Sequence, residues 1–216
     1  IDAAANAGAD DVKFQTYQVD QLVTSTAPKA AYQKQTTGAD ESQHEMLKKL
    51  QLSYDAHYLI RDHCQSRKIK FLSAPFDSDS VTFLTSKMNL KTLKIPSGEI
   101  TNGPLLVQIA RCGVDVILST GMCTLTDVEQ ALAVLAFGYT STATGFNDPQ
   151  FGEAYRSQEG QKILKEKVTL LHCTTEYPTL PEDVNLNAMQ TLHTKFGLDI
   201  GLSDHTEGIY APIAAV

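Results

Sequence analysis

The chain of 216 residues is long enough for one globular domain with a substantial core, since 42% of its residues are hydrophobic and 20% are charged. Its formal net charge of −7, without a basic block, argues against nucleic acid as its main partner. It contains no apolar run long enough to span a bilayer, and its four cysteines lack CxxC spacing, so we expect a cytoplasmic protein with free thiols.

Six short apolar runs, each followed by polar residues, predict buried strands. In chain order they lie at residues 11–17, 69–76, 92–97, 115–121, 168–175 and 199–206. Nearly continuous apolar strands are typical of a sheet that is covered on both faces, which requires parallel strands joined by helical crossovers.

Amphipathic segments between these strands predict the crossover helices. They cover residues 53–68, 77–88, 103–113, 124–138 and 185–197, and the last two end in glycine, as helices often do. Further helical patterns at residues 1–8 and 209–216 have no start or stop signal of their own, so we expect an internal piece of a longer protein. The alternation of strand and helix predicts the α/β class.

Two stretches interrupt this alternation. Residues 24–45 predict a long polar loop or lid after the first strand. Residues 139–162 are rich in Gly, Thr and Ser and are too long for a simple connection. We expect both stretches to border the mouth of the site and to influence the choice of substrate.

An open doubly wound sheet and a closed barrel both fit alternating strands and helices. No GxGxxG or GxxxxGK[ST] motif follows a strand, whereas polar residues end all six strands. A barrel collects such residues from many strands onto one face. We therefore predict one incomplete TIM (β/α)8 barrel over residues 1–216, with six of its eight strands present and the first and last missing.

The polar residues at the strand ends form the predicted site. They are Lys13, Gln15, Ser73, Lys94, Ser97, Glu99, Ser119, Thr120, His172, Thr174, Thr175, Tyr177, Ser203, Asp204 and His205. Two lysines with several short hydroxyl side chains suit a small phosphorylated or carboxylated substrate. Strand alternation places Lys94 and Ser97 on opposite faces, so the turn at residues 96–98 must redirect the serine.

Single residues of this set allow more than one interpretation. Lys94 could be a Schiff-base nucleophile or a permanent cation that holds an anion. His205 is a candidate metal ligand or a structural histidine, and Asp204 could support it or contact the substrate. The remaining histidines on loops and helices are expected to be solvated: His44, His57, His63 and His193.

Seven motifs resemble, in this order, the sialic acid synthase (N-acetylneuraminate synthase) family, which includes the legionaminate and pseudaminate synthases. They are VKFQTY, FLSAPFD, LKIPSGE, ILSTGM, LLHCTTEYPT, PEDVNL and IGLSDHT, and the resemblance extends from Ala4 to Ala215. It implies a TIM barrel that condenses phosphoenolpyruvate with an N-acetylmannosamine-type sugar, giving a nine-carbon 2-keto acid and phosphate. It also implies a divalent metal, typically Mn²⁺, and a homodimer with a C-terminal antifreeze-like domain absent from this chain.

The resemblance also implies roles for individual residues. Lys13 and Lys94 would anchor phosphoenolpyruvate, Gln15 would face the sugar, Glu99 would act as general acid or base, and His205 would be one metal ligand, the second lying outside this chain. Further substrate contacts are expected from Ser73, Ser97, Ser119, Thr175, Tyr177, Ser203 and Asp204. Some members have threonine at the position of Ala74 and asparagine at that of Thr175, which puts these two phosphate contacts in question.

Two other functions compete with the synthase. One is a Schiff-base pyruvate aldolase or lyase that uses Lys94, and the other is a non-catalytic barrel that binds phosphosugars. The presence of both Glu99 and His205 favours the synthase over a binding protein.

Overall fold

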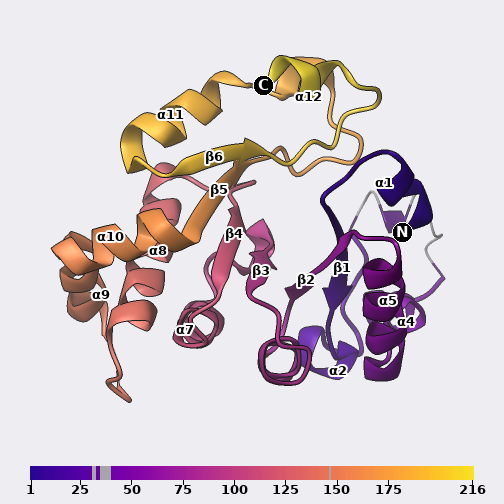
Figure 1. The fold of residues 1–216 in the computed structure, drawn as a ribbon, viewed down its shortest axis with the longest axis horizontal. Coiled ribbons are helices and arrows are strands. Elements are labelled where there is room, and N and C mark those ends of the chain that lie inside the picture. Colours follow the sequence, from indigo (N-terminus) through magenta and orange to yellow (C-terminus); the bar gives the residue numbers. More distant parts are fainter. Residues whose placement is uncertain (31–32, 35–39, 146) are drawn as a thin grey trace. The chain divides into compact units, whose positions relative to one another are not determined.

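The computed structural model describes residues 1–30, 33–34, 40–145 and 147–216. The chain divides into two compact units, unit 1 at Ile1–Leu90 and unit 2 at Lys91–Val216. Each unit holds one sheet (Figure 1): β1 and β2 pair in unit 1, and the strands of unit 2 pair in the order β3-β4-β5-β6. Every one of these strand pairs is parallel, as the sequence predicts.

Unit 1 contains two strands and the helices around them. The elements are α1 (Asp2–Asn6), β1 (Asp11–Thr16), α2 (Val19–Leu22), α4 (Gln43–Leu50), α5 (Tyr54–Ser66), β2 (Lys70–Pro75), α6 (Ser78–Thr82) and the π-helical turn η1 (Phe83–Lys87). Ser53 and Asp77 begin α5 and α6 by accepting a hydrogen bond from a backbone amide of the first turn. The helices predicted at 53–68 and 77–88 are therefore confirmed, although the second changes to π-helical geometry at Phe83.

A chain of buried hydrogen bonds joins α5 to both strands of unit 1. The Ser73 hydroxyl lies 2.7 Å from Thr16 Oγ1, which lies 2.8 Å from His57 Nε2. The His57 Nδ1–H donates to the Ser53 carbonyl oxygen at 2.8 Å, so Nε2 is the acceptor for the Thr16 hydroxyl. His57 is fully buried, and this burial lowers its pKa. The expectation that His57 is solvated is therefore wrong, because a neutral imidazole with both nitrogens bonded can be buried at little cost.

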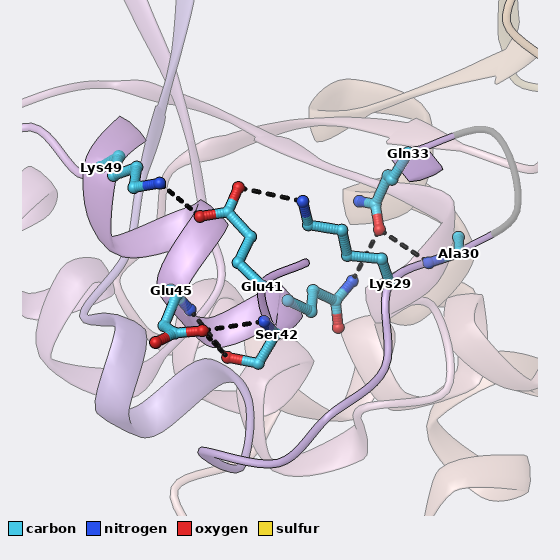
Figure 2. Close-up of polar contacts among 8 residues, drawn as sticks. Lys29, Ala30, Gln33, Glu41, Ser42, Glu45 and Lys49 are labelled. Atoms are coloured by element: carbon cyan, nitrogen blue, oxygen red, sulfur yellow. Dashed lines mark hydrogen bonds and ion pairs between the residues drawn. The ribbon is translucent and has the colours of Figure 1, made fainter. Parts of the chain in front are cut away.

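The polar stretch at 24–45 is partly helical. The predicted loop is wrong at its end, because α4 begins at Gln43 and Ser42 precedes it as the capping residue. The Ser42 hydroxyl accepts from the Glu45 amide, and the Glu45 carboxylate accepts from the Ser42 amide at 2.9 Å (Figure 2). Part of the predicted loop lies outside the described residues, namely 31–32 and 35–39.

An ion pair connects the two described ends of this stretch. The Glu41 carboxylate lies 2.9 Å from the Lys29 ammonium and also contacts Lys49 (Figure 2). Lys29 is buried, so Glu41 provides the opposite charge that a buried ammonium requires. The hydrogen bonds from Lys49 and Lys29 hold the pKa of the Glu41 carboxyl below its usual value.

Unit 2 alternates strands and helices. Its elements are β3 (Thr92–Ile95), the 3₁₀ turn η2 (Ser97–Glu99), α7 (Gly103–Arg111), β4 (Asp115–Ser119), α8 (Leu125–Thr140), α9 (Asp148–Arg156), α10 (Gln158–Lys167), β5 (Val168–His172), the 3₁₀ turn η3 (Pro181–Asp183), α11 (Asn187–Phe196), β6 (Asp199–Leu202) and α12 (Tyr210–Ala214). The helices predicted at 103–113 and 185–197 are confirmed, and Gly197 ends α11 with a φ of 64°.

The sheet of unit 2 has one face packed against helices. Fully buried side chains point to this face from the three strands β3, β4 and β5: Leu93, Ile95, Val116, Leu118, Val168 and Leu170. The strand residues between them are more exposed. Each strand therefore stabilises the fold with one face and leaves the other available for polar groups.

Helix α8 is buried on nearly all sides because α7, α9 and α10 pack around it. The prediction that it ends at Gly138 is wrong, since the helix continues to Thr140. A Cβ atom at Gly138 would lie 2.6 Å from Ala110 Cβ and 3.1 Å from the Val107 carbonyl oxygen. Gly138 therefore allows α7 and α8 to approach closely. No described helix, α8 included, has the length and apolar character needed to cross a membrane.

The loop predicted at 139–162 is wrong over most of its length, because it contains α9 and the start of α10. Asn147 and Ser157 cap these two helices. The connection before α9 lies at the amino end of β4, where the Tyr139 hydroxyl donates to the Val114 carbonyl oxygen at 2.7 Å. It therefore lies at the opposite edge of the sheet from the polar strand ends, not at the mouth of the predicted site.

All six predicted strands are present, and the α/β class is confirmed. The strands are shorter than predicted, because the polar residues after them leave the sheet and form loops. The described residues form two separate parallel sheets, so the closed barrel remains a prediction.

We predict opposite effects on stability for alanine at two helical glycines. Gly138→Ala should lower the free energy of unfolding by about 1–3 kcal/mol, because the new methyl group meets α7. Gly152→Ala in α9 should raise it by about 0.5–1 kcal/mol, because only the flexible Arg156 guanidinium lies nearby. Urea denaturation measures the free energy of unfolding of both variants. An equal change in the two would show that α7 and α8 are not in close contact.

We predict that His57 makes unit 1 less stable in acid. Its folded-state pKa is lowered, so below the unfolded value near 6.5 the unfolded state binds more protons. The stability contributed by neutral His57 is fully present above that pH and is lost as the pH falls toward the folded-state pKa. Urea midpoints between pH 7.5 and about pH 5 should fall less for His57→Gln than for the wild type. The exposed His63→Gln is the control, and equal slopes for His57→Gln and wild type would contradict the prediction.

Candidate functional site

The predicted site residues divide between the two units. Unit 1 carries Lys13, Gln15 and Ser73. Unit 2 carries Lys94, Ser97, Glu99, Ser119, Thr120, His172, Thr174, Thr175, Tyr177, Ser203, Asp204 and His205. Lys13 lies near the middle of β1. The other residues of each group lie on or beyond the carboxyl-terminal halves of their strands, which are parallel within each sheet.

In unit 1, the strands place Lys13 and Gln15 on one face and Ser73 on the other. Lys13 and Gln15 alternate with Thr16, and Thr16 shares its buried hydrogen bond with Ser73. The register pairs Gln15 with Ala74, so Ala74 is the β2 residue on the Gln15 face. Lys13 is exposed, yet neighbouring atoms remove part of the water around its ammonium and lower its pKa. Two polar groups of β1 therefore share a surface with Ala74 rather than with Ser73.

In unit 2, the register aligns Lys94 with the more exposed face of the sheet. Lys94 pairs with Ile117, which pairs with Thr169, and side chains paired in a parallel sheet point to the same face. Ser119 lies two residues beyond Ile117 on that same face. A lysine and a serine from neighbouring strands thus point to one side.

Two hydroxyls beside the end of β4 are buried without a hydrogen bond to any described protein group. They are Ser119 Oγ and Thr175 Oγ1. Gly121 lies between them in sequence and packs tightly, since a Cβ atom there would lie 2.3 Å from Thr175 Oγ1 and 2.8 Å from Cys173 Sγ. Buried hydroxyls require a partner, and oxygen atoms of an anionic ligand can provide it.

Glu99 lies in the turn that connects β3 to α7. The strand ends at Ile95, and Ser97–Glu99 forms a 3₁₀ turn, so the strand alternation stops before Ser97. The redirection of the Ser97 side chain stays a prediction. The Glu99 Oε2 atom accepts a hydrogen bond from Asn102 Nδ2 at 2.8 Å. Asn102 Oδ1 accepts from the Leu105 amide at 3.3 Å and so caps α7. The carboxylate is thereby attached to the start of a buried helix.

His205 is held in one tautomer by the loop after β5. Its Nδ1–H donates to the Thr174 carbonyl oxygen at 2.7 Å, which leaves Nε2 with a lone pair. Ser203 Oγ lies 3.3 Å from Nε2. The Tyr177 ring, half of whose surface is exposed, covers the imidazole with ring centroids 4.3 Å apart. Nε2 can therefore accept a hydrogen bond or bind a metal ion.

Two other predicted site residues make bonds within the protein. The Asp204 carboxylate accepts from the Thr206 amide at 3.0 Å and from the Thr206 hydroxyl at 3.2 Å. His172 donates from Nε2 to the Val184 carbonyl oxygen at 2.7 Å. Both side chains hold the loops at the strand ends, which suits a supporting role for each.

A cavity of about 800 Å³ lies beside these loops. Its lining includes Met122 after β4 and Thr174, Thr175, Asp183 and Asn185 after β5. Its size falls within the usual range for small-molecule pockets, which is roughly 300–1,000 Å³. The unpaired Thr175 hydroxyl therefore belongs to a residue that borders a space large enough for a substrate.

His205 is the candidate imidazole ligand for a metal ion. Within the residues that the structure describes, no three His, Cys, Asp or Glu side chains come together as a metal site would require. His205 Nε2 fits the chemistry of a divalent-metal ligand, since Nδ1 is fixed by a carbonyl oxygen, as is usual for ligating histidines.

Two residues near the site escaped prediction from sequence. Asn102 attaches Glu99 to α7, and its signal was an asparagine two residues before Pro104, at the position where helices are capped. His57 fixes the strand residues behind Lys13 and Gln15, but no sequence signal distinguishes it from a solvated helical histidine.

Several known proteins similar to this chain are named as sugar-acid synthases. The profile of the NeuB family matches residues 1–216. The N,N'-diacetyllegionaminic acid synthase of Campylobacter jejuni is 45% identical over 216 residues, and that of Legionella pneumophila is 44% identical over 214 residues. Among solved structures, the N-acetylneuraminic acid synthetase of Leptospira borgpetersenii serovar Hardjo-bovis, in complex with citrate, aligns with a TM-score of 0.73 at 28% identity.

These similarities cover nearly all of this chain but only part of its relatives. They cover 100% of it for the Campylobacter protein and 99% for both the Legionella protein and the Leptospira structure. The chain spans 58% and 54% of the two curated relatives and 61% of the Leptospira chain.

We predict that removing the unpaired hydroxyls weakens anion binding without weakening the fold. Ser119→Ala and Thr175→Val should leave the free energy of unfolding unchanged or raise it by up to about 1 kcal/mol, because each removes a buried unpaired group. If phosphoenolpyruvate is the anionic ligand, its dissociation constant, measured by calorimetry, should rise about tenfold, the effect of one hydrogen bond to a charged group.

Ser73→Ala is the matched control, because Ser73 is also a buried strand serine but is bonded to Thr16. It should lower the free energy of unfolding by about 1 kcal/mol. A comparable loss for Ser119→Ala, with unchanged phosphoenolpyruvate binding, would contradict the proposed difference between the two serines.

Proposed function

The chain belongs to the NeuB family, and we propose that the protein containing it condenses phosphoenolpyruvate with an N-acylated amino sugar. The products would be a nine-carbon 2-keto acid of the sialic acid type and inorganic phosphate. The names of the two curated relatives favour a legionaminate-type acceptor, a diacetylated and deoxygenated relative of N-acetylmannosamine.

One observation carries the proposal: the buried, unpaired hydroxyls of Ser119 and Thr175 lie at the strand ends of unit 2. Phosphoenolpyruvate brings phosphate and carboxylate oxygens that accept hydrogen bonds from such groups. Lys94, on the same sheet face as Ser119, would supply positive charge. Lys13 of unit 1 is the second phosphoenolpyruvate anchor that the family resemblance implies. Ser97 would add a further contact with the phosphate.

The reaction forms one carbon–carbon bond and breaks one carbon–oxygen bond. The C3 carbon of phosphoenolpyruvate attacks the sugar aldehyde carbon, and the aldehyde oxygen takes up a proton, for which Glu99 is the proposed donor. Water adds at C2, the former enol carbon, and phosphate leaves with the bridging oxygen. The 2-keto group then forms, so the atoms of phosphoenolpyruvate, sugar and water are all contained in the two products.

Each unit has its own candidate contacts for the acceptor sugar. Gln15 is the proposed sugar contact of unit 1, and Tyr177 and Ser203 are the nearest candidates around His205 in unit 2. Asp204 would act through its loop, since its carboxylate is bonded to Thr206. Ser73 would support β1 through Thr16 instead of contacting the substrate directly.

His205 is the residue of this chain that would hold a divalent metal, with Mn²⁺ as the expected ion. When bound, such an ion supplies Lewis acidity that polarises the open-chain aldehyde. The Thr174 carbonyl oxygen keeps the ligand nitrogen in the required tautomer, and Tyr177 limits the rotation of the imidazole.

The proposal also includes a closed TIM barrel and a homodimer. Six parallel strands with crossover helices, and the likeness to a sialic acid synthetase structure, support a TIM barrel, which needs two strands more than the six described. The homodimer and a separate C-terminal domain rest on the family resemblance, and the cytoplasmic location rests on the spacing of the cysteines and the lack of a long apolar run. All three stand as predictions.

We predict that phosphate release from phosphoenolpyruvate depends on the acceptor sugar and on Glu99. The complete reading frame is assayed with N-acetylmannosamine and with its diacetylated, deoxygenated relatives. Glu99→Gln should lower kcat about 100-fold or more, because the proton donor is lost. The exposed Glu153→Gln in α9 is the control. A chelator should also abolish release, and added Mn²⁺ should restore it.

The alternatives give different results in the same experiments. A Schiff-base lyase would be trapped on Lys94 by borohydride in the presence of pyruvate, whereas the synthase forms no imine. A binding protein would retain phosphoenolpyruvate affinity but release no phosphate with any sugar. Either result, from a folded full-length protein, would overturn the proposal.

A further inference from the structure

The turn between β3 and α7 is fixed by backbone hydrogen bonds on both sides of Glu99. The Glu99 amide donates to the Pro96 carbonyl oxygen at 3.0 Å, and the Asn102 amide donates to the Glu99 carbonyl oxygen at 3.0 Å. Ile100 is buried directly after the turn. The Glu99 main chain is therefore held in place, and the remaining freedom lies in its side chain.

Asn102 restrains that side chain through the two ends of one amide. Its oxygen accepts from the Leu105 amide at 3.3 Å, and its nitrogen donates to Glu99 Oε2 at 2.8 Å. Leu105 and Leu106 of α7 are buried, so the helix that carries the cap is itself fixed. A rigid helix end is thus linked to a carboxylate by a charge-assisted hydrogen bond.

Helix capping alone does not require asparagine at this position. Aspartate and serine cap helices about as well, because capping uses only an acceptor oxygen. The bond to Glu99 needs a donor that reaches the carboxylate, and the asparagine amide supplies it. The same side chain therefore has two tasks that can be separated by substitution.

We propose that Asn102 is a positioning residue, which holds the Glu99 carboxylate in the orientation needed for proton transfer to the acceptor sugar. This inference rests on the proposed function of Glu99. Proton transfer depends on placing the acid within hydrogen-bond reach of the reacting oxygen, and a glutamate side chain has three rotatable bonds to restrain. Asn102 removes this freedom before the substrate arrives.

The experiment compares two variants that keep an acceptor oxygen for the cap and replace the amide donor. Asn102→Asp has no donor when ionised, and Asn102→Ser has only a hydroxyl on a shorter side chain. Asn102→Ser should melt close to the wild type, because an acceptor oxygen remains for the Leu105 amide. Asn102→Asp keeps the cap as well but should melt lower, because its carboxylate lies beside that of Glu99. Both should lower kcat about tenfold or more, while KM for phosphoenolpyruvate changes less than about threefold. A purely structural role would change stability and leave kcat intact.

Asn147→Asp is the matched control. Asn147 also caps a helix of unit 2, with its Oδ1 accepting from the Gln150 amide at 3.3 Å, and it lies in the α8–α9 connection, which meets the amino end of β4. The same substitution there should change neither kcat nor KM. Rates are compared at a temperature at which circular dichroism shows all variants folded.

Glu99→Gln, assayed in parallel, separates two kinds of failure. If Glu99→Gln is inactive while both Asn102 variants keep kcat within about twofold of wild type, the role of Asn102 is wrong and the proposed function stands. If Glu99→Gln is fully active, the role of Glu99 fails, and that of Asn102 fails with it.

Discussion

Parallel strand pairing places the carboxyl ends of β3, β4, β5 and β6 along one edge of a single sheet. Parallel strands are joined by crossovers, so the chain leaves that edge through a polar loop after each of the four strands. These loops contain the turn at Glu99, Gly121 with its close packing against Thr175, and the hydrogen bond between His205 and the Thr174 carbonyl oxygen. The location of the chemistry is thus a consequence of the strand direction.

One face of each strand packs in the core and stabilises the fold, whereas the other face carries polar groups of the proposed site. In unit 2, Leu93 and Ile95 pack against helices while Lys94 between them points away. In unit 1, Thr16 and Ser73 bond toward His57 in α5, and Gln15 occupies the other face. Because helix packing stabilises one face, the other can tolerate unpaired hydroxyls that lower the stability of the ligand-free protein.

The spacing of hydrophobic residues predicts the strands and most of the helices, because the buried face of each element repeats at a fixed interval along the sequence. The strand ends were overestimated, because polar residues beyond Ile95 and Leu202 continue the alternation after the hydrogen-bonded ladder has stopped. Gly138 was misread as a helix end, since a glycine at a helix contact and one at a terminus look identical in sequence. Barrel closure depends on strand pairs that one sequence does not reveal.

The site itself was partly accessible from sequence. The motifs placed Lys94, Glu99 and Ser119 at strand ends, where the structure has them. The partners that restrain them were not accessible, because Asn102 reads as an ordinary helix cap and the Thr174 contact to His205 uses a main-chain oxygen. A sequence gives the type of each side chain, but a structure is needed to find which backbone groups the side chains bond to.

The connection from α8 to α9 has a practical consequence for anyone who wishes to attach something to this protein. Residues 142–145 are exposed and belong to a connection that meets the amino end of β4, the opposite edge from the loops around His205. Exposed loops of this kind accept insertions well. A fluorescent label or surface tether placed there would lie at the edge opposite the loops of the proposed site, whereas one placed at the exposed Tyr177 would lie beside His205.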